Sequence, residues 1–168
     1  MIEVRGKKLS QDDVNQLFIQ ACYDGDLAKV VTAVQEFKAN INCMDSLNYA
    51  RALVYALRSC EGKDSEGEQV VKYLVNQGAE INFKHGAKGE YMDSRPYFIY
   101  HAAQNTLNVS DDLVYFLIQK GAKDYLNYVP TTSKGEHYVS ALDKIKFHRP
   151  NLYKKLVKEK IVVETNKR

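Results

Sequence analysis

Apolar residues recur at helical spacing in four places along the chain, and a similar short segment follows each of them. The clearest example runs VVKYLVNQGAEIN from Val70 to Asn82, with four apolar residues on one helical face before Gly78. Glycine readily takes the left-handed backbone conformation that ends a helix. The other apolar stripes begin at residues 30, 113 and 152, so successive stripes start 40, 43 and 39 residues apart. This pattern predicts a helical repeat protein.

A second helical pattern precedes each stripe, so each unit is predicted to be a pair of helices. The first helix should run from about Gln11 to Tyr23. Ser10 and Asp13 resemble a helix N-cap with an acidic first turn, although a full capping box carries Glu or Gln at the later position. In the second unit a polar loop, 59–69, should separate the helices. The third unit should open its first helix at Pro96, and the fourth at Ser140.

The expected fold class is therefore all-α, a solenoid of about four helix-turn-helix repeats with long finger loops between them. The predicted divisions are a flexible lead-in over 1–10, one repeat domain over 11–162, and a tail over 163–168. Within the domain, the repeats are expected at about 11–42, 43–82, 83–124 and 125–162.

These units resemble ankyrin repeats, which pair two antiparallel helices with a β-turn in about 33 residues. Gly78-Ala79-Glu80-Ile81-Asn82 is similar to the family's G-A-D-V-N segment, and Ile99 to Ala103 is similar to its inner helix. The resemblance covers roughly residues 11 to 162. No unit keeps the family's Thr-Pro-Leu-His, and the longer spacing implies inserted loops. The alternative is another solenoid of helical pairs.

Composition agrees with one ordinary globular domain. The 168 residues are 45% apolar and 27% charged, with a net charge of +3. No run of 18 apolar residues predicts a membrane span, and the opening 13 residues lack the apolar stretch of a secretory signal. Three widely spaced cysteines fit neither a disulfide framework nor a zinc site, and we expect reduced thiols and a cytoplasmic location.

The sequence offers little support for catalysis or cofactor binding. Cys22 and His101 could be imagined as nucleophile and base, but Cys22 occupies a small-residue position on a core face. The four histidines show no ligand pair at helical spacing, and no glycine-rich phosphate loop is present. We expect no enzyme, no cofactor, no metal and no small-molecule substrate. The lysines of 154–160 predict a solvated helix face, with nucleic acid an unlikely partner.

The ankyrin resemblance implies that a partner binds along the inner helices, the first helix of each pair. Aromatic, guanidinium and imidazole side chains suit such an interface. The candidates on these helices are Tyr23, Tyr55, Arg58, His101, Gln104 and Lys144. The alternative is a solvated helix face whose aromatic rings pack partly on the next repeat.

Two loops before inner helices are about six residues longer than the preceding one, and both mix tyrosine with basic residues. Long insertions on one face of a repeat array often form its binding face. The candidates there are Lys84, His85, Tyr91, Arg95, Tyr97, Tyr128 and His137. The alternative is tolerated drift in length, because lengthening a surface loop costs little free energy.

The leading hypothesis is a non-enzymatic protein-interaction module that binds a partner protein through a concave face and elongated finger loops. Such a stack is also similar to effectors that intracellular bacteria deliver into host cells, which would place it in the host cytoplasm. The alternative is a scaffolding or targeting domain of a larger protein that contains an enzyme.

Overall fold

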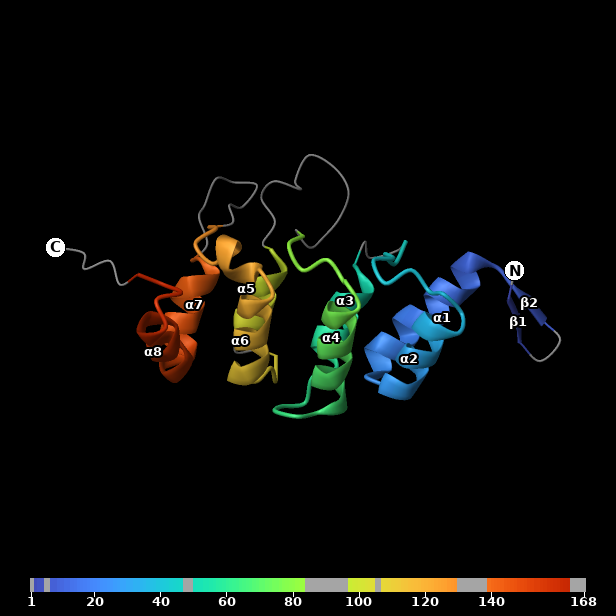
Figure 1. Cartoon of the computed structure of the whole chain (residues 1–168), viewed down its shortest axis with the longest axis horizontal. Coiled ribbons are helices and arrows are strands. Elements are labelled where there is room, and N and C mark those ends of the chain that lie inside the picture. Colours follow the sequence, from blue (N-terminus) through green and yellow to red (C-terminus); the bar gives the residue numbers. More distant parts are fainter. Residues whose placement is uncertain are drawn as a thin grey trace.

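The computed structural model describes residues 2–4, 7–46, 50–83, 97–104, 107–129 and 139–163. Its described part contains eight α-helices in four consecutive pairs, which lie in order along an elongated molecule (Figure 1). The predicted all-α class is confirmed at this level. The helices are α1 Gln11–Asp24, α2 Leu27–Gln35, α3 Ala52–Arg58, α4 Glu66–Asn76, α5 Phe98–Ala103, α6 Asp111–Gln119, α7 Ala141–His148 and α8 Pro150–Lys158; a short 3-10 helix, η2 Ala122–Tyr125, follows α6.

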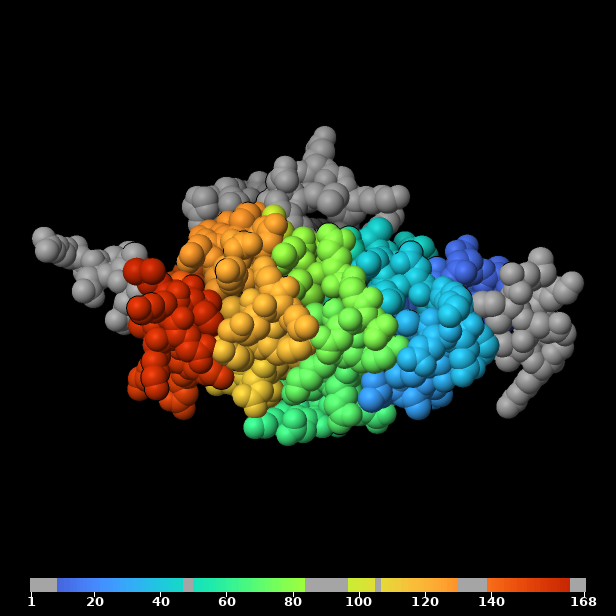
Figure 2. Space-filling model, in the orientation of Figure 1, coloured from blue at the N-terminus to red at the C-terminus, as the bar shows by residue number. Residues whose placement is uncertain are grey.

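Each pair is numbered here as a unit, from unit 1 (α1 and α2) to unit 4 (α7 and α8). Helices α1, α3, α5 and α7 are the inner helices, and α2, α4, α6 and α8 are the outer helices. Helix α1 packs against α3, α2 against α4, and α5 against α7. Figure 2 shows the units as successive bands of surface from one end of the molecule to the other.

Two short strands lie within the predicted lead-in over 1–10. Strand β1 (Ile2–Val4) and strand β2 (Lys7–Leu9) pair in antiparallel register, with Ile2 opposite Leu9. Each strand has only three residues, which is shorter than the runs of about four to eight over which alternation becomes a readable signal. The sequence analysis therefore did not predict this strand pairing.

Side-chain caps explain where most helices begin. Ser10, Asp26, Ser65, Ser110 and Ser140 each accept a hydrogen bond from the backbone N–H three residues later. Asp13 and Asp143 complete reciprocal capping boxes with Ser10 and Ser140, so aspartate fills a role that we had reserved for Glu or Gln. The cap at Ser65 starts α4 at Glu66, so the last four residues of the predicted loop, 66–69, are helical. Helix α5 is shorter than predicted and begins at Phe98.

The ends of the outer helices repeat one backbone geometry. A residue with positive φ follows each outer helix, and these residues are Lys38, Gly78, Gly121 and Lys160. After α4, the Ala79 N–H donates to the Leu74 carbonyl at 2.9 Å, and after α8 the Ile161 N–H donates to the Leu156 carbonyl at 3.0 Å. These bonds satisfy carbonyl groups that the helix leaves without an intrahelical partner. Gly78 is the residue at which the sequence pattern predicted a helix end, and the other three follow the apolar stripes that begin at residues 30, 113 and 152.

Small residues on the inner helices and branched residues on the outer helices build the core. Ala56, Val70, Leu113 and Leu156 are fully buried. Gly67 lies where α4 crosses the end of α3, and a Cβ there would come within 2.4 Å of the Ser59 carbonyl oxygen. Glycine at this position therefore permits the close approach of the two helices.

Asparagine side chains join neighbouring units through the segments that connect one unit to the next. Asn42 follows unit 1, and its side-chain oxygen accepts from the Glu80 N–H of the segment after α4 at 2.9 Å. Asn82 occupies the corresponding place after unit 2 and donates to the Gly121 carbonyl after unit 3 at 3.3 Å. The two asparagines thus tie the segment after unit 1 to the segment after unit 2, and the segment after unit 2 to the segment after unit 3.

A second set of polar contacts joins units 2 and 3 at the opposite end of the helices. The fully buried Glu68 carboxylate accepts from the Ser110 N–H at 2.7 Å and from the Asp64 N–H at 3.3 Å. The Gly62 N–H donates to the Asn108 carbonyl at 2.7 Å, and Lys63 pairs with Asp112 at 2.7 Å. The loop that precedes α4 is therefore fastened to the residues that precede α6.

Candidate functional site: the inner-helix face

The predicted binding residues on the inner helices do not all have the same exposure. Tyr23 on α1 is 59% exposed, and Arg58 at the end of α3 is also exposed. Tyr55 is buried, and its ring lies edge-on to that of Tyr23 with centroids 6.1 Å apart. His101, Gln104 and Lys144 are half-buried. We use the term inner-helix face for the surface that these six residues share.

Tyr23 and Tyr55 lie beside a carboxylate that the sequence analysis missed. The Tyr55 hydroxyl donates to Asp45 Oδ2 at 2.6 Å. Asp45 lies just before α3, where residues 44 and 51 pair across an isolated bridge. A small hollow of about 240 Å³ lies between these groups, lined by Gln16, Ile19, Gln20, Tyr23, Asp45 and Tyr55. We call it the tyrosine pocket. Asp45 is recognised as a residue of this pocket only from its hydrogen bond to Tyr55, ten residues away, because no local sequence pattern indicates it.

The second half of the inner-helix face combines aromatic rings with cations. Lys144 Nζ lies 4.7 Å from the centroid of the Tyr100 ring, a contact that joins α7 to α5. The rings of Tyr100 and His101 lie 5.8 Å apart. The Gln104 carbonyl accepts a long hydrogen bond of 3.5 Å from Arg149, so the backbone at this residue helps to hold unit 4. Lys144 and Gln104 therefore have structural contacts in addition to their place on the face.

Phe147 gives the same face its most exposed aromatic ring. It is 81% exposed at the end of α7, and Val139, just before that helix, is 53% exposed. A hollow of about 620 Å³ lies beside them, lined by Val139, Asp143, Lys144, Lys146, Phe147 and His148. Large apolar side chains this open to water are a feature of interaction surfaces when they gather in one place. Phe147 lies three residues after Lys144, and this helical spacing is the sequence signal for its place beside Lys144.

The predicted loop residues fall into two groups. Tyr97 and Tyr128 come together with Tyr125, since the Tyr97 centroid lies 4.0 Å from that of Tyr125 and 4.9 Å from that of Tyr128. All three are half-buried, and the cluster connects α5 with the segment after η2. The other predicted residues, Lys84, His85, Tyr91, Arg95 and His137, lie outside the residues that the structure describes.

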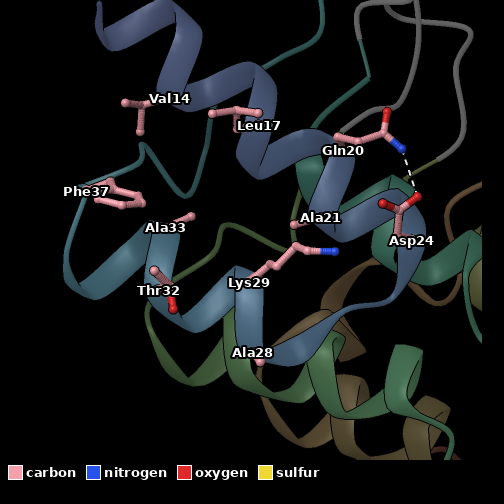
Figure 3. Close-up of a pocket in the computed structure, with 10 residues that line it drawn as sticks. All are labelled: Val14, Leu17, Gln20, Ala21, Asp24, Ala28, Lys29, Thr32, Ala33 and Phe37. Carbon is pink, nitrogen blue, oxygen red and sulfur yellow. Dashed lines mark hydrogen bonds between the residues drawn. The ribbon is translucent and has the colours of Figure 1, made fainter. Parts of the chain in front are cut away.

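A separate apolar groove lies on unit 1, on the side away from unit 2. Figure 3 shows Val14 and Leu17 on α1 facing α2 and Phe37 across it. The groove holds about 480 Å³, and Leu17 is 58% exposed in it. At one end the Gln20 amide donates to Asp24 at 2.8 Å (Figure 3). Helical spacing of Val14, Leu17 and Ala21 was the sequence signal for this second apolar stripe.

The described thiols are poorly suited to nucleophilic chemistry. Cys22, Cys43 and Cys60 are all buried and form no disulfide. Burial raises the pKa of Cys43 and of Cys60 to about 12, and it raises the pKa of Cys22 further, with the neighbouring Cys43 adding to the effect. A thiol with a raised pKa remains protonated at neutral pH and is a weak nucleophile. Within the described ranges, no cluster of His, Cys, Asp or Glu is arranged to hold a metal ion.

Comparisons with known proteins leave this chain without an assigned family. The sequence matches no protein-family model and no curated protein. Among solved structures, one similar chain comes from a structure titled "Bd0816 Predatory Endopeptidase from Bdellovibrio bacteriovorus in complex with immunity protein Bd3460". It is 18% identical, covers 86% of this chain and 81% of its own, and has a TM-score of 0.43. A likeness of this degree fixes neither fold family nor function. No helix in the described part of the chain is both long and apolar enough to cross a membrane.

Proposed function

We propose that this protein is a non-enzymatic interaction module, an ankyrin-like solenoid of four units that binds another protein through its inner-helix face. Three features support the solenoid: the pairs follow one another along the molecule, their outer helices end in the same left-handed geometry, and equivalent asparagines bridge successive units. In such arrays each repeat contacts its neighbours, which leaves a long face for a partner.

The observation that carries the proposal is the pair of exposed aromatic rings at the two ends of the row of inner helices. Tyr23 on α1 and Phe147 on α7 are 59% and 81% exposed, and Arg58 lies between them along the row. Exposed rings of this kind contribute little to the stability of the stack. Tyrosine and arginine are enriched among the residues that dominate binding energy at protein interfaces.

The inner-helix face is also largely preformed. Tyr55 is held by Asp45, and Lys144 lies against Tyr100, so these side chains lose little freedom when a partner arrives. Tyr97 directly precedes the inner helix α5 and contacts Tyr128, and we include both half-buried tyrosines in the proposed surface. Rigid binding surfaces retain more of their contact energy as affinity, because ordering costs are smaller.

An exchange of three exposed side chains tests this proposal. The variant Tyr23→Ala, Arg58→Ala, Phe147→Ala should lose partners that the parent protein captures from cell lysate, measured by quantitative mass spectrometry. The control variant Gln35→Ala, Asn76→Ala, Lys154→Ala alters exposed positions on the outer helices and should keep them. Circular dichroism should show the same helix content in all three proteins. Equal recovery of every protein by the two variants would contradict the proposal.

The alternative function is a scaffolding or targeting domain of a larger protein that contains an enzyme. The groove between α1 and α2 favours it, because an apolar surface at the end of the row is suited to packing against another domain. Leu17→Glu separates the two functions. If the groove is the working surface, this variant abolishes partner capture, whereas capture through the inner-helix face is unchanged.

A further inference from the structure

The two end units of the row carry opposite charge. Units 1 and 4 lie at the two ends of the elongated molecule (Figure 1). Residues 11–42 of unit 1 contain five acidic side chains and two lysines, a formal net charge of −3. Residues 141–163 of unit 4 contain two acidic side chains, six lysines and one arginine, a net charge of +5 with histidine neutral. Surfaces of opposite charge attract each other in solution and steer association.

The end of unit 1 is apolar at a place where repeat arrays usually have polar residues. A terminal repeat needs a polar outer face to stay soluble. The groove between α1 and α2 instead combines the exposed Leu17 with Val14 and Phe37 (Figure 3). Because this groove of about 480 Å³ faces away from unit 2, the protein's own next unit does not cover it.

The groove of unit 1 also has a negative charge at one end. Asp24 lines that end and accepts a hydrogen bond from the Gln20 amide at 2.8 Å, a neutral donor that leaves the charge of the carboxylate in place (Figure 3). Lys29 lines the groove as well, but it pairs with Asp26 at 2.6 Å, which offsets its charge. The groove is therefore suited to an apolar surface that has a cation beside it.

Contacts with unit 3 show which side of unit 4 is directed away from the row. Lys144 on α7 and Lys155 on α8 each lie over an aromatic ring of unit 3. Lys146 and Tyr153 lie two residues from these lysines, which is about 200° around a helix, so they lie on the opposite side. They also contact each other, with Lys146 Nζ 5.4 Å from the Tyr153 centroid. We call this side the free side of unit 4.

The free side of unit 4 has the properties that the groove requires. Leu142 lies four residues before Lys146, and Val157 lies four residues after Tyr153, so all four side chains share this side. Leu142, Tyr153 and Val157 are half-buried, and Lys146 is exposed. The free side therefore presents apolar groups next to a cation.

We propose that this protein self-associates head to tail, with the free side of unit 4 packed into the unit 1 groove of a second copy. Lys146 of one copy then lies near Asp24 of the next. Unit 1 of the second copy takes the place that a fifth unit of the solenoid would occupy, so the contact continues the packing of one unit on another. Two copies joined through the same end would bring like charges together. A head-to-tail contact leaves one end of each kind open and extends to longer chains.

Sedimentation velocity of the full chain tests this inference. At low salt the sedimentation coefficient should rise with protein concentration and pass beyond that of a dimer, and high salt should reduce this rise because it screens the charges. Leu17→Glu and Asp24→Lys alter exposed positions in the groove, and Lys146→Glu alters the free side. Each variant should weaken association by about tenfold or more.

Mixing two variants distinguishes a head-to-tail contact from a symmetric one. Leu17→Glu keeps an intact free side, and Lys146→Glu keeps an intact groove. Each should be monomeric alone at concentrations where the parent associates, whereas an equal mixture should form a dimer and nothing larger. If Leu17→Glu loses helix content by circular dichroism, Asp24→Lys replaces it in the mixture.

Lys158→Glu is the matched control on α8. Lys158 is exposed and lies three residues after Lys155, on the side towards unit 3, so the same change of charge should leave self-association at the parent level. Three results overturn the inference: a parent protein that is monomeric at every concentration, a mixture that remains monomeric, or a Lys158→Glu variant as impaired as Lys146→Glu. A monomeric parent would leave the groove to another domain.

The same measurements separate this inference from the proposed function. The variant Tyr23→Ala, Arg58→Ala, Phe147→Ala changes neither the groove nor the free side, so it should self-associate as the parent does. If the parent is monomeric while capture from lysate depends on those three residues, the interaction module stands and head-to-tail association is wrong. If the parent self-associates but capture is indifferent to the inner-helix face, only the interaction proposal is wrong.

Discussion

Lys160 occupies a backbone position that glycine holds after two of the four outer helices. Its φ is +57°, close to the +55° of Lys38, and the equivalent residues in units 2 and 3 are Gly78 and Gly121. A left-handed conformation costs a residue with a Cβ roughly 1–2 kcal/mol, and the flexibility of glycine in the unfolded chain offsets part of any gain. Lys160→Gly should therefore raise the free energy of unfolding by about 0.5–1 kcal/mol, measured by urea denaturation.

The converse substitution provides the control. Gly78→Ala places a Cβ at φ +92°, and its surroundings leave open space, so any destabilisation reports backbone strain and not a clash. It should lower the free energy of unfolding by about 1 kcal/mol. If both variants leave the urea midpoint at the parent value, the shared helix-end geometry does not contribute to stability.

The buried thiols predict a loss of stability in alkali. The pKa of Cys43 and that of Cys60 rise from 9.0 to about 12 because burial disfavours the thiolate. Between these values the unfolded chain releases protons that the native protein keeps, so stability is complete below about pH 9 and falls as pH rises towards 12. Each thiol contributes at most about 1.4 kcal/mol per pH unit. Urea unfolding at pH 7.5 and pH 10 measures the loss.

The variant Cys43→Ala, Cys60→Ala isolates this effect from tyrosine ionisation. It should lose less stability than the parent between the two pH values, although its stability at pH 7.5 is lower because two buried side chains are smaller. Identical pH dependence in both proteins would show that the thiols ionise in the native state as readily as in the unfolded chain.

At the scale of elements, Glu68 connects α4 to the start of α6. Its carboxylate accepts from two backbone N–H groups, and Lys72 lies 4.0 Å away. Glu68→Ala leaves those two donors without this acceptor, and an unsatisfied buried donor costs about 1–3 kcal/mol. We expect a loss of about 2–3 kcal/mol in urea unfolding and faster amide hydrogen exchange at Ser110.

Glu66→Ala is the matched comparison on the same helix. The Glu66 carboxylate accepts from the Leu27 N–H at 3.0 Å, but the residue is exposed, and water replaces the lost acceptor. Its cost should remain below about 1 kcal/mol. If the two variants lose the same free energy of unfolding, the buried contact between units 2 and 3 stabilises the protein no more than the exposed one.

At the scale of the whole molecule, the sequence predicted the features that depend on residues close together in the chain. The apolar stripes and the helix end at Gly78 follow from residues within one turn, and the structure has them where expected. Lys38, Gly121 and Lys160 share the same left-handed geometry after the other outer helices. Glu68 was assigned to a polar loop because its charge indicates solvent exposure. Its burial depends on a partner 42 residues away, which no local window contains.

The candidate site also contains some residues that the sequence could predict and others that it could not. Tyr23 and Arg58 could be chosen because the ankyrin resemblance implies that these positions lie on the exposed side of an inner helix, and both residues are exposed. Asp45 could not be chosen, since its place in the tyrosine pocket depends on how residues 44–51 fold back towards Tyr55. Tyr55 was chosen for exposure but is buried, because its ring fills the space between units 1 and 2.

The stacked arrangement makes a prediction that separates a linear array from a single cooperative core. Leu156 on α8 and Leu57 on α3 are both buried to within 1% of their surface, and leucine-to-alanine changes at such sites cost about 2–5 kcal/mol. In a linear array the stability of a unit depends on its own contacts and those with its neighbours. Leu156→Ala should therefore accelerate amide exchange in α7 and α8 while α1 to α4 keep the parent rates, measured by hydrogen exchange with mass spectrometry.

Leu57→Ala is the control, because it removes the same atoms from a unit with neighbours on both sides. Its effect should extend to α1 and α2, which pack on α3 and α4. It should also extend to α5 and α6, because the Phe98 ring stacks on Phe83 and the Ser110 N–H donates to Glu68. A single cooperative core would respond differently, with both variants raising the exchange rates of all eight described helices to the same extent. That outcome would contradict the solenoid and, with it, the long inner-helix face on which the proposed function depends.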